Sequence, residues 1–278
     1  MSGTASLEGL RLAPRPRYLA LAFTGAQRMI AYPRTVLLNL MANLVWLAVS
    51  YQLWGAVFAS TAQVGSFDWA RMRTYVLLSQ ALVLFLNATD SVYRMVFLVR
   101  MGDIATELLR PYDILKGQLA ISTGSALVSG GLGAGVIAAI GFLRLDALPP
   151  ASPEAAALFG VSLVLGFLLR FLVGFISALI TFWTMNWLGV SWAQSALVSI
   201  LSGALIPLEL YPEWLRSLAL VFPFHGILHT PLAIYLGDLR GGAIVGALAI
   251  QAFWVVALWG VARLMWRPGV RALDIQGG

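Results

Sequence analysis

Long apolar stretches recur along this chain, and they constrain its fold more than any other feature. A helix needs about 20 consecutive apolar residues to cross the hydrocarbon layer of a bilayer, and short polar segments separate several stretches of that kind. Hydrophobic residues make up 60% of the chain, charged residues make up 11%, and the mean hydropathy is +0.84. This composition is typical of an integral membrane protein and not of a soluble domain.

The apolar stretches predict an all-α membrane protein with six transmembrane helices. They form one domain, residues 35–265, between a cytoplasmic tail with an interfacial helix (1–34) and a second cytoplasmic tail (266–278). The interfacial helix is predicted from Arg17 to Ile30, where apolar residues recur at helical spacing; an extension of the first span is the alternative. The predicted spans cover residues 35–59, 74–93, 118–142, 155–183, about 192–207 and 241–265.

The segment between the last two predicted spans departs from this pattern. Between Glu209 and Arg240 the chain has Pro212, Pro223 and Pro231 and only short apolar runs. Such runs are too short to cross a bilayer, yet they are too apolar to lie free in water. We expect one or two re-entrant or interfacial helices here, because non-helical backbone is tolerated at membrane depth only when it packs against protein or lines a cavity.

The basic residues predict the side of the membrane on which each loop lies. Cytoplasmic loops carry an excess of Lys and Arg. With six spans and a cytoplasmic N-terminus, twelve of the 18 Lys and Arg residues are cytoplasmic and Arg170 lies within the membrane. The five on the outer side are Arg71, Arg73, Arg144, Arg216 and Arg240. We therefore expect both termini in the cytoplasm and residues 209–240 outside.

The densest run of charge, Arg100 to Lys116, lies between the second and third predicted spans and hence in the cytoplasm. Asp103 and Glu107 are one helical turn apart, each followed by an apolar residue, and Pro111 ends the helix that they form. The pattern predicts a helix of about two turns with an acidic side and an apolar side. A plain charged loop is the alternative, but the length and position favour a docking element for a cytoplasmic protein.

Catalytic and ligand-binding motifs are mostly absent. The sequence has no GxxxxGK[ST], HExxH or GxSxG, so neither nucleotide binding through a phosphate loop nor enzyme chemistry is expected of this chain. The two histidines, His225 and His229, are four residues apart, but no acidic third ligand has suitable spacing, and no metal site is predicted. The net charge of +6 comes from arginines scattered at segment ends, so we expect no nucleic-acid partner.

Arg170 lies near the centre of the fourth predicted span. An arginine at that depth costs about 2.5–3.5 kcal/mol on insertion scales, so its side chain must pair or face water. It either lines a substrate path or is fixed by a helix-end carbonyl or an acid such as Asp90, and the sequence leaves both alternatives open. The residues of a possible substrate path are Asn43, Trp46, Phe85, Arg170 and Ser202.

Two patterns bear on helix packing. Asn39, Asn43 and Gln52 of the first span are expected to face other helices rather than lipid. In the third span, Gly131 and Gly135 form a GxxxG that lets another helix approach closely, and we favour packing within the chain over dimerisation.

Taken together, these patterns resemble a known family. The six spans, the charged loop GDIATELLRPYD, and above all LSGALIPLELYPEWLRSLALVFPF followed by HTPLAIYLG are similar to the permease subunits of bacterial type-2 ABC exporters. The likeness covers nearly the whole chain. Its most specific pattern is carried by Ser202, Gly203, Pro207, Pro212, Pro223 and Phe224.

The resemblance implies a multi-pass protein of the bacterial inner (plasma) membrane that pairs with a second permease, identical or homologous. It also implies two separate P-loop ATPase subunits per transporter, which bind ATP and Mg, while this chain itself binds no cofactor. In this family a cytoplasmic coupling helix contacts the ATPase, and here it falls on Gly102, Asp103, Ile104, Glu107, Leu108 and Arg110. The outer re-entrant helices fall on residues 210–231, in a segment that includes Pro207, Pro212, Pro223, Phe224 and His225.

The expected function is export of a hydrophobic or amphiphilic substrate, drug-like or lipid-like, out of the cytoplasm or the inner leaflet. The scarcity of polar residues within the spans argues against a wide glycan channel. The competing classes are a secondary transporter, which would need intramembrane acids and inverted repeats, and a non-catalytic membrane assembly subunit.

Overall fold

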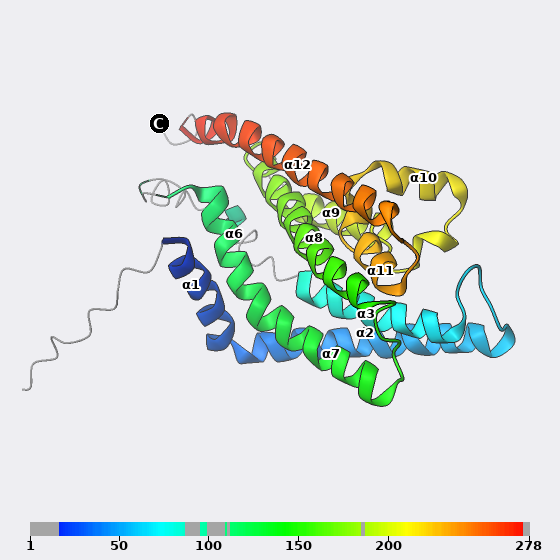
Figure 1. The fold of residues 1–278 in the computed structure, drawn as a ribbon. Helices are drawn as coiled ribbons and strands as arrows, with labels where there is room; N and C mark the ends of the chain where they lie inside the picture. Colours follow the sequence, from blue (N-terminus) through cyan, green and yellow to red (C-terminus); the bar gives the residue numbers. More distant parts are fainter. Residues whose placement is uncertain (1–16, 87–94, 99–108, 110–111, 185–186, 275–278) are drawn as a thin grey trace, which may run out of the picture.

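The computed structural model describes residues 17–86, 95–98, 109, 112–184 and 187–274, and the regular elements over these ranges are helices. In chain order they are α1 (Arg17–Ala31), α2 (Pro33–Ser60), α3 (Trp69–Leu86), α6 (Ile114–Ser125), the π-helical turn η1 (Ala126–Gly130), α7 (Gly131–Arg144), α8 (Pro153–Ile180), α9 (Trp187–Leu201), η2 (Leu208–Leu210), α10 (Glu213–Val221), η3 (Pro223–Gly226), α11 (His229–Leu236) and α12 (Gly242–Asp274). Figure 1 shows α2, α3 and α7 on one side of the molecule and α8, α9 and α12 on the other.

Four helical segments are long and apolar enough to cross a membrane: Pro33–Ser60, Ile114–Arg144, Pro153–Ile180 and Gly242–Gly269. They correspond to the first, third, fourth and sixth predicted spans, which places the chain among multi-pass membrane proteins. The second predicted span begins earlier, as α3, and its last residues lie outside the described part of the chain. The number of six spans stays a prediction.

The fifth predicted span has the wrong boundaries. Helix α9 begins at Trp187 and ends at Leu201, whereas the sequence predicted about 192–207. The chain turns at Gly203, whose φ of +82° lies in the left-handed region that favours glycine. Since a helix cannot continue through that conformation, Pro207 belongs to the following segment.

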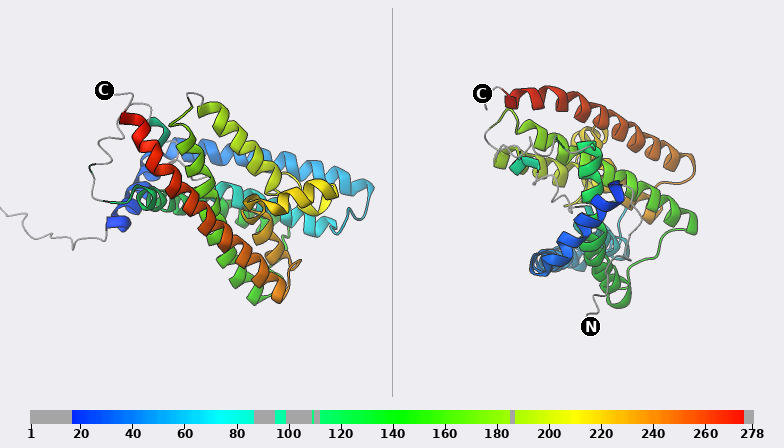
Figure 2. Two further views of the ribbon diagram at one scale, coloured as in Figure 1. Left: turned by 90° about the horizontal axis from the view of Figure 1, so that it is seen from above. Right: turned by 90° about the vertical axis from the view of Figure 1, so that its left-hand side faces the viewer.

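Helix α8 is the central helix. The most apolar window of α8 is 61% buried, against 6% for α2 and 11% for α12. It packs along α12, as the left view of Figure 2 shows, and also against α11, α9 and α3. A residue in the middle of α8 therefore faces several helices at once.

Helix α1 is separate from α2 and crosses α6 with unusually close backbones. A Cβ at Gly25 would lie 2.1 Å from the Ile121 oxygen, and one at Gly124 would lie 1.8 Å from the Ala22 oxygen. Such contact between backbones requires glycine on both helices. The break before Pro33 shows that α1 is no simple extension of the first span. The amphipathic helix predicted there is present, and its place in the membrane interface stays a prediction.

The GxxxG prediction for packing within the chain is wrong. A Cβ at Gly135 would meet nothing within 4 Å, whereas one at Gly130 would lie 2.8 Å from the Phe85 backbone and one at Gly133 would lie 2.1 Å from Leu84. The π turn at Ala126–Gly130 adds a residue to one turn and so rotates the helix face that meets α3.

The polar residues of α2 do not pack as expected within the chain. Asn39 and Gln52 are exposed, and the Asn43 amide donates to the Asn39 carbonyl of its own helix at 2.9 Å. Leu47 alone is fully buried among the residues of α2.

The α1–α6 crossing can be tested with two matched glycine substitutions. We expect Gly124→Ala to destabilise the protein by about 1–3 kcal/mol, because the methyl group overpacks a site with no space. Gly135→Ala is the control: it adds the same methyl to a helix in open space, and we expect it to be neutral or slightly stabilising. Thermal unfolding in detergent measures both, and equal midpoints for the two variants would contradict the close crossing.

Candidate functional site

Arg170 lies on α8, ten residues before the end of the helix, with only 9% of its surface exposed. Its side chain lines two cavities, which we call the first and the second Arg170 cavity. The first, of about 20 Å³, lies between α8 and α9 toward their connection, and the second, of about 130 Å³, lies toward the outer segment. Arg170 thus stands where the two cavities meet.

The polar groups around the first cavity come from both helices. The lining residues are Val96, Arg170, Gly174, Ser177, Ala178, Thr181, Trp187, Val190, Ser191 and Gln194. The Gln194 Nε2 atom is buried and has no hydrogen-bond partner among the described residues. A buried amide donor without a partner costs about 1–3 kcal/mol, so the site is suited to an added acceptor.

The second cavity is more apolar and is closed by the outer segment. It is lined by Val83, Leu86, Arg170, Ser195, Val198, Ser199, Ala204, Ile227 and Leu228. The serines with which α9 lines the two cavities were not predicted from the sequence, although Ser191, Ser195 and Ser199 recur at intervals of four residues and so share one helix face.

The predicted path residues divide into two groups. Phe85 packs against Phe167, with ring centroids 6.2 Å apart, one turn from Arg170. Ser202 is fully buried beyond the second cavity, and its hydroxyl has no partner among the described residues. Asn43 and Trp46 lie on α2 and do not line either Arg170 cavity. For Arg170 itself, the cavities agree with a lining role, while Asp90 lies outside the described residues.

The segment between α9 and α12, which we call the outer segment, contains four short helices with a proline at or near the start of each. Pro207 and Pro212 precede η2 and α10, Pro223 is the first residue of η3, and Pro231 lies in the first turn of α11. Proline suits these positions because its fixed φ favours the first turn and its missing N–H is not needed there. Short helices are therefore present where one or two re-entrant or interfacial helices were predicted, and their position in the membrane stays a prediction.

Buried hydrogen bonds attach this segment to the spans. The Gln251 amide of α12 donates to the Gly226 carbonyl at 2.7 Å and to the Ser162 carbonyl of α8 at 3.2 Å, and the Ser162 hydroxyl donates to Gln251 Oε1 at 2.9 Å. The backbone of η3 also lies directly on α8, since a Cβ at Gly166 would be 2.9 Å from the Ile227 oxygen.

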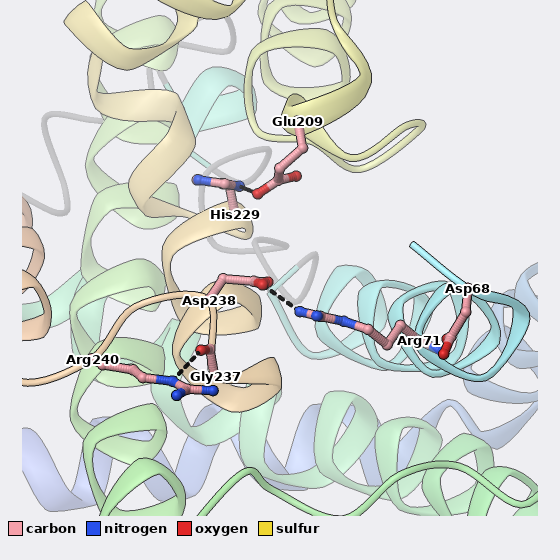
Figure 3. Close-up of polar contacts among 7 residues, drawn as sticks. All are labelled: Asp68, Arg71, Glu209, His229, Gly237, Asp238 and Arg240. Carbon is pink, nitrogen blue, oxygen red and sulfur yellow. Dashed lines mark hydrogen bonds and ion pairs between the residues drawn. The ribbon is translucent and has the colours of Figure 1, made fainter. Parts of the chain in front are cut away.

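A polar network surrounds the outer ends of α3 and α11 (Figure 3). Arg71 forms an ion pair with Asp238, and its backbone N–H donates to the Asp68 carboxylate at 2.8 Å. The Glu209 carboxylate faces His229 at 3.5 Å. His225 contacts the Phe222 carbonyl instead, at 2.7 Å, and the described residues contain no group of three possible metal ligands.

Comparison with known protein families identifies the family of this chain. The sequence profile of the family described as ABC-2 family transporter protein matches residues 44–277. The chain belongs to this family. It is a type-2 ABC permease, the transmembrane subunit of a transporter whose ATPase activity resides in separate subunits. A comparison with curated proteins finds no match.

The residues predicted to form the coupling helix, Gly102, Asp103, Ile104, Glu107, Leu108 and Arg110, lie outside the described residues. Leu109 is described, and its surface is 86% exposed. Just beyond this segment, Asp113 caps α6 by accepting from the Lys116 N–H at 3.0 Å, and its second oxygen pairs with Arg263 of α12. One side chain thus connects the start of α6 to α12.

Burial controls the protonation of the Glu209–His229 pair in the outer segment of the permease. It lowers the pKa of His229 to about 4, with smaller contributions from His225 and Arg216, and it raises the pKa of Glu209. At neutral pH the imidazole is therefore uncharged, and its contact with Glu209 is a polar contact and not an ion pair.

The lowered pKa of His229 predicts a loss of stability in acid. The His229 imidazole takes up a proton less readily in the folded state than in the unfolded state. Its contribution to the free energy of unfolding is therefore complete above pH 6.5 and is lost as the pH falls toward 4. The loss is at most about 3 kcal/mol. We expect His229→Gln to lose less stability between pH 6.5 and 4 than the wild type, as measured by thermal unfolding.

Glu209→Gln is the control, because its expected effect on the loss of stability in acid has the opposite sign. Because the folded pKa of Glu209 is raised, its protonation favours the folded state as the pH falls. Removing that group should make the acid loss steeper. Identical pH profiles for the wild type and His229→Gln would contradict the assigned burial of His229.

Proposed function

We propose that this permease is part of an exporter that moves a hydrophobic or amphiphilic substrate, drug-like or lipid-like, out of the cytoplasm or the inner leaflet. The observation that carries the proposal is the pair of cavities that meet at Arg170 within a permease of the ABC-2 family. They combine apolar walls with one cation, Arg170, and with hydroxyl and amide groups of α8 and α9. Such a site suits an amphiphile better than a large glycan.

The proposal includes both termini in the cytoplasm of a bacterial inner membrane and six spans. Two contacts support the grouping of loops on the two sides, while the orientation itself rests on the distribution of basic residues. Arg263 near the C-terminus pairs with Asp113 at the start of α6, and both belong to the side predicted to be cytoplasmic. Arg71 pairs with Asp238, and both belong to the side predicted to be outer.

A second permease, identical or homologous, completes the transporter in this proposal. Asn39 and Gln52 on α2 are exposed, although an amide in hydrocarbon without a partner is costly. Helix α9 exposes most of its length as well, including Trp192 at 76%. A partner permease that covers Asn39 and Gln52 on α2 removes this cost and leaves α9 facing a central path, around which the first, second and fifth spans are arranged.

The proposed mechanism is alternating access or lateral extrusion, driven by two P-loop ATPase subunits that bind ATP and Mg. The coupling helix, with Asp103 and Glu107 as its acidic side, receives their motion. Asp113 joins this segment to α6 and α12, and α12 packs along α8, which carries Arg170. At the outer end Ile227 and Leu228 close the second cavity, so release requires the outer segment to move.

Co-purification tests the class of protein directly. A soluble ATPase recovered in stoichiometric amount with the affinity-purified permease supports an ATP-driven exporter. A transport-competent preparation without an ATPase would instead favour a secondary transporter or, if it shows no transport of its own, a membrane assembly subunit.

Charge reversal tests the coupling helix. We expect the double variant Asp103→Lys, Glu107→Lys to lower the recovery of the ATPase subunit by at least about tenfold, because it replaces attraction by repulsion at the docking surface. The measurement is the ratio of ATPase to permease after affinity purification, together with ATP turnover.

The matched control places two reversals on the opposite side, Glu154→Lys and Glu213→Lys, at exposed helix starts. It should leave ATPase recovery unchanged. Wild-type recovery and turnover in the Asp103, Glu107 variant, with an unchanged thermal midpoint, would remove the coupling role.

A further inference from the structure

An open groove along α9 adjoins both Arg170 cavities. It has a volume of about 530 Å³ and is lined by Trp187, Leu188, Ser191, Trp192 and Ser195. It shares Trp187 and Ser191 with the first cavity and Ser195 with the second. The three spaces therefore adjoin one another along α9; we call the side at Arg170 the closed end and the α9 groove the open end.

The two ends of this region differ in chemistry. The closed end presents hydrogen-bond donors and a positive charge: the Arg170 guanidinium, the buried Gln194 Nε2 without a partner, and the serine hydroxyls of α9. The lining residues of the three spaces, as far as the chain is described, include no carboxylate. Arg170 already has an interaction within the protein, but a guanidinium has five N–H donors and can bind a further acceptor.

The open end is apolar and wide. Trp187, Leu188 and Trp192 supply most of its surface, and Trp192 is 76% exposed. A hydrocarbon chain fits this surface because α9 crosses the apolar part of the molecule. The closed end is limited in size. One water needs about 10–15 Å³ of cavity volume, so the second cavity, with about 130 Å³, accommodates a phosphate-sized group but not an oligosaccharide.

We propose that this region binds a single-chain amphiphile with an anionic headgroup, the headgroup at Arg170 in the second cavity and the chain in the α9 groove. The proposal names the substrate class of the permease and in that respect rests on the proposed function. Charge complementarity at the closed end selects this occupant over a second copy of the chain, whose apolar α9 surface offers nothing for Arg170 to bind.

Binding can be measured on the purified permease in phosphatidylcholine nanodiscs, without any ATPase. The probes are three bromoalkyl amphiphiles with the same chain and a phosphate, a trimethylammonium or an uncharged hydroxyl headgroup. Bromine quenches nearby tryptophans, and Trp187 and Trp192 line the groove. We expect the phosphate probe to bind at least about tenfold more tightly than the trimethylammonium probe, as for a charge-assisted pair in a buried site.

Variants assign the contact to its residues. Arg170→Gln should weaken phosphate binding about tenfold and leave the uncharged probe unchanged, whereas Arg170→Lys should retain most of the affinity. Arg263→Gln is the matched control, since it removes an arginine that lies outside the region. If Arg170→Gln does not fold, Ser199→Ala supplies the same test at a second donor of the same cavity.

Three results would overturn the proposal. The first is equal or tighter binding of the trimethylammonium probe, and the second is phosphate binding that is unaffected by Arg170→Gln and Ser199→Ala. The third is a groove occupied by a second copy, seen if Ser195→Trp disrupts the oligomer and leaves probe binding intact. Loss of probe binding in phosphatidylglycerol nanodiscs would assign the site to a bilayer lipid, and this too overturns a single-chain substrate. None of these results depends on ATPase co-purification, so the proposed function can fail independently.

Discussion

The hydrogen bonding of the non-helical backbone between α9 and α12 is the constraint on which the rest of this structure depends. A buried carbonyl or N–H without a partner costs about 1–3 kcal/mol, and the turns between the short helices leave several backbone groups of this segment outside any helix. Fixed hydrogen-bond partners satisfy them. Gln251 of α12 binds the Gly226 carbonyl, Tyr75 of α3 donates to the Gly203 carbonyl at 2.6 Å, and the His229 N–H donates to the Ser202 carbonyl at 3.0 Å. Helices α3 and α12 are thereby held to this segment, and the third bond joins the segment to itself beside the second Arg170 cavity.

These attachments are unequal in strength, and this inequality indicates where the molecule can open. The Gln251 amide is 1% exposed, so breaking its bonds leaves buried polar groups unpaired. The Arg71–Asp238 pair is partly exposed, with 31% and 26% of its side chains accessible, and such pairs contribute little because water replaces the partner. The exposed pair is therefore the contact that breaks first. Helix α11 itself is held by the burial of residues 230–235 and by the Tyr235 hydroxyl, which donates to the Leu148 carbonyl at 3.0 Å.

The sequence predicted the spans and the broken segment, which follow from hydrophobicity and proline. It did not predict the features that depend on the path of the backbone, such as helix ends and the face on which two helices pack. Helices α2, α8 and α12 agree with their predicted spans, and the short helices after Pro212 and Pro223 agree with the predicted broken segment. The end of α9 at Leu201 was missed because an isolated glycine is compatible with a helix until its φ is known. Packing through Gly131 and Gly135 was predicted on an ideal helix, and the π turn before them changed the face that meets α3. Arg170 was identified by its charge alone, whereas Gln194 became a candidate only when α9 was placed against α8.

The two ends of the permease differ in how their helices are held together. At the end that carries Asp113, α1 and α6 are pressed together at Gly25 and Gly124, so they move as one body. Beside Asp113 lies a cavity of about 160 Å³, between α6, α8 and α12, next to a buried cluster that Ile114 and Leu115 of α6 share with Ala262 of α12. In the proposed mechanism, a displacement at Asp113 reaches α12 through this cluster and, through the long contact of α12 with α8, Arg170. Helix α9 contacts α8 over a much smaller surface and need not follow. The expected consequence is sliding between α8 and α9, which changes the two cavities that Arg170 shares while the buried Gln251 contacts hold the outer segment in place.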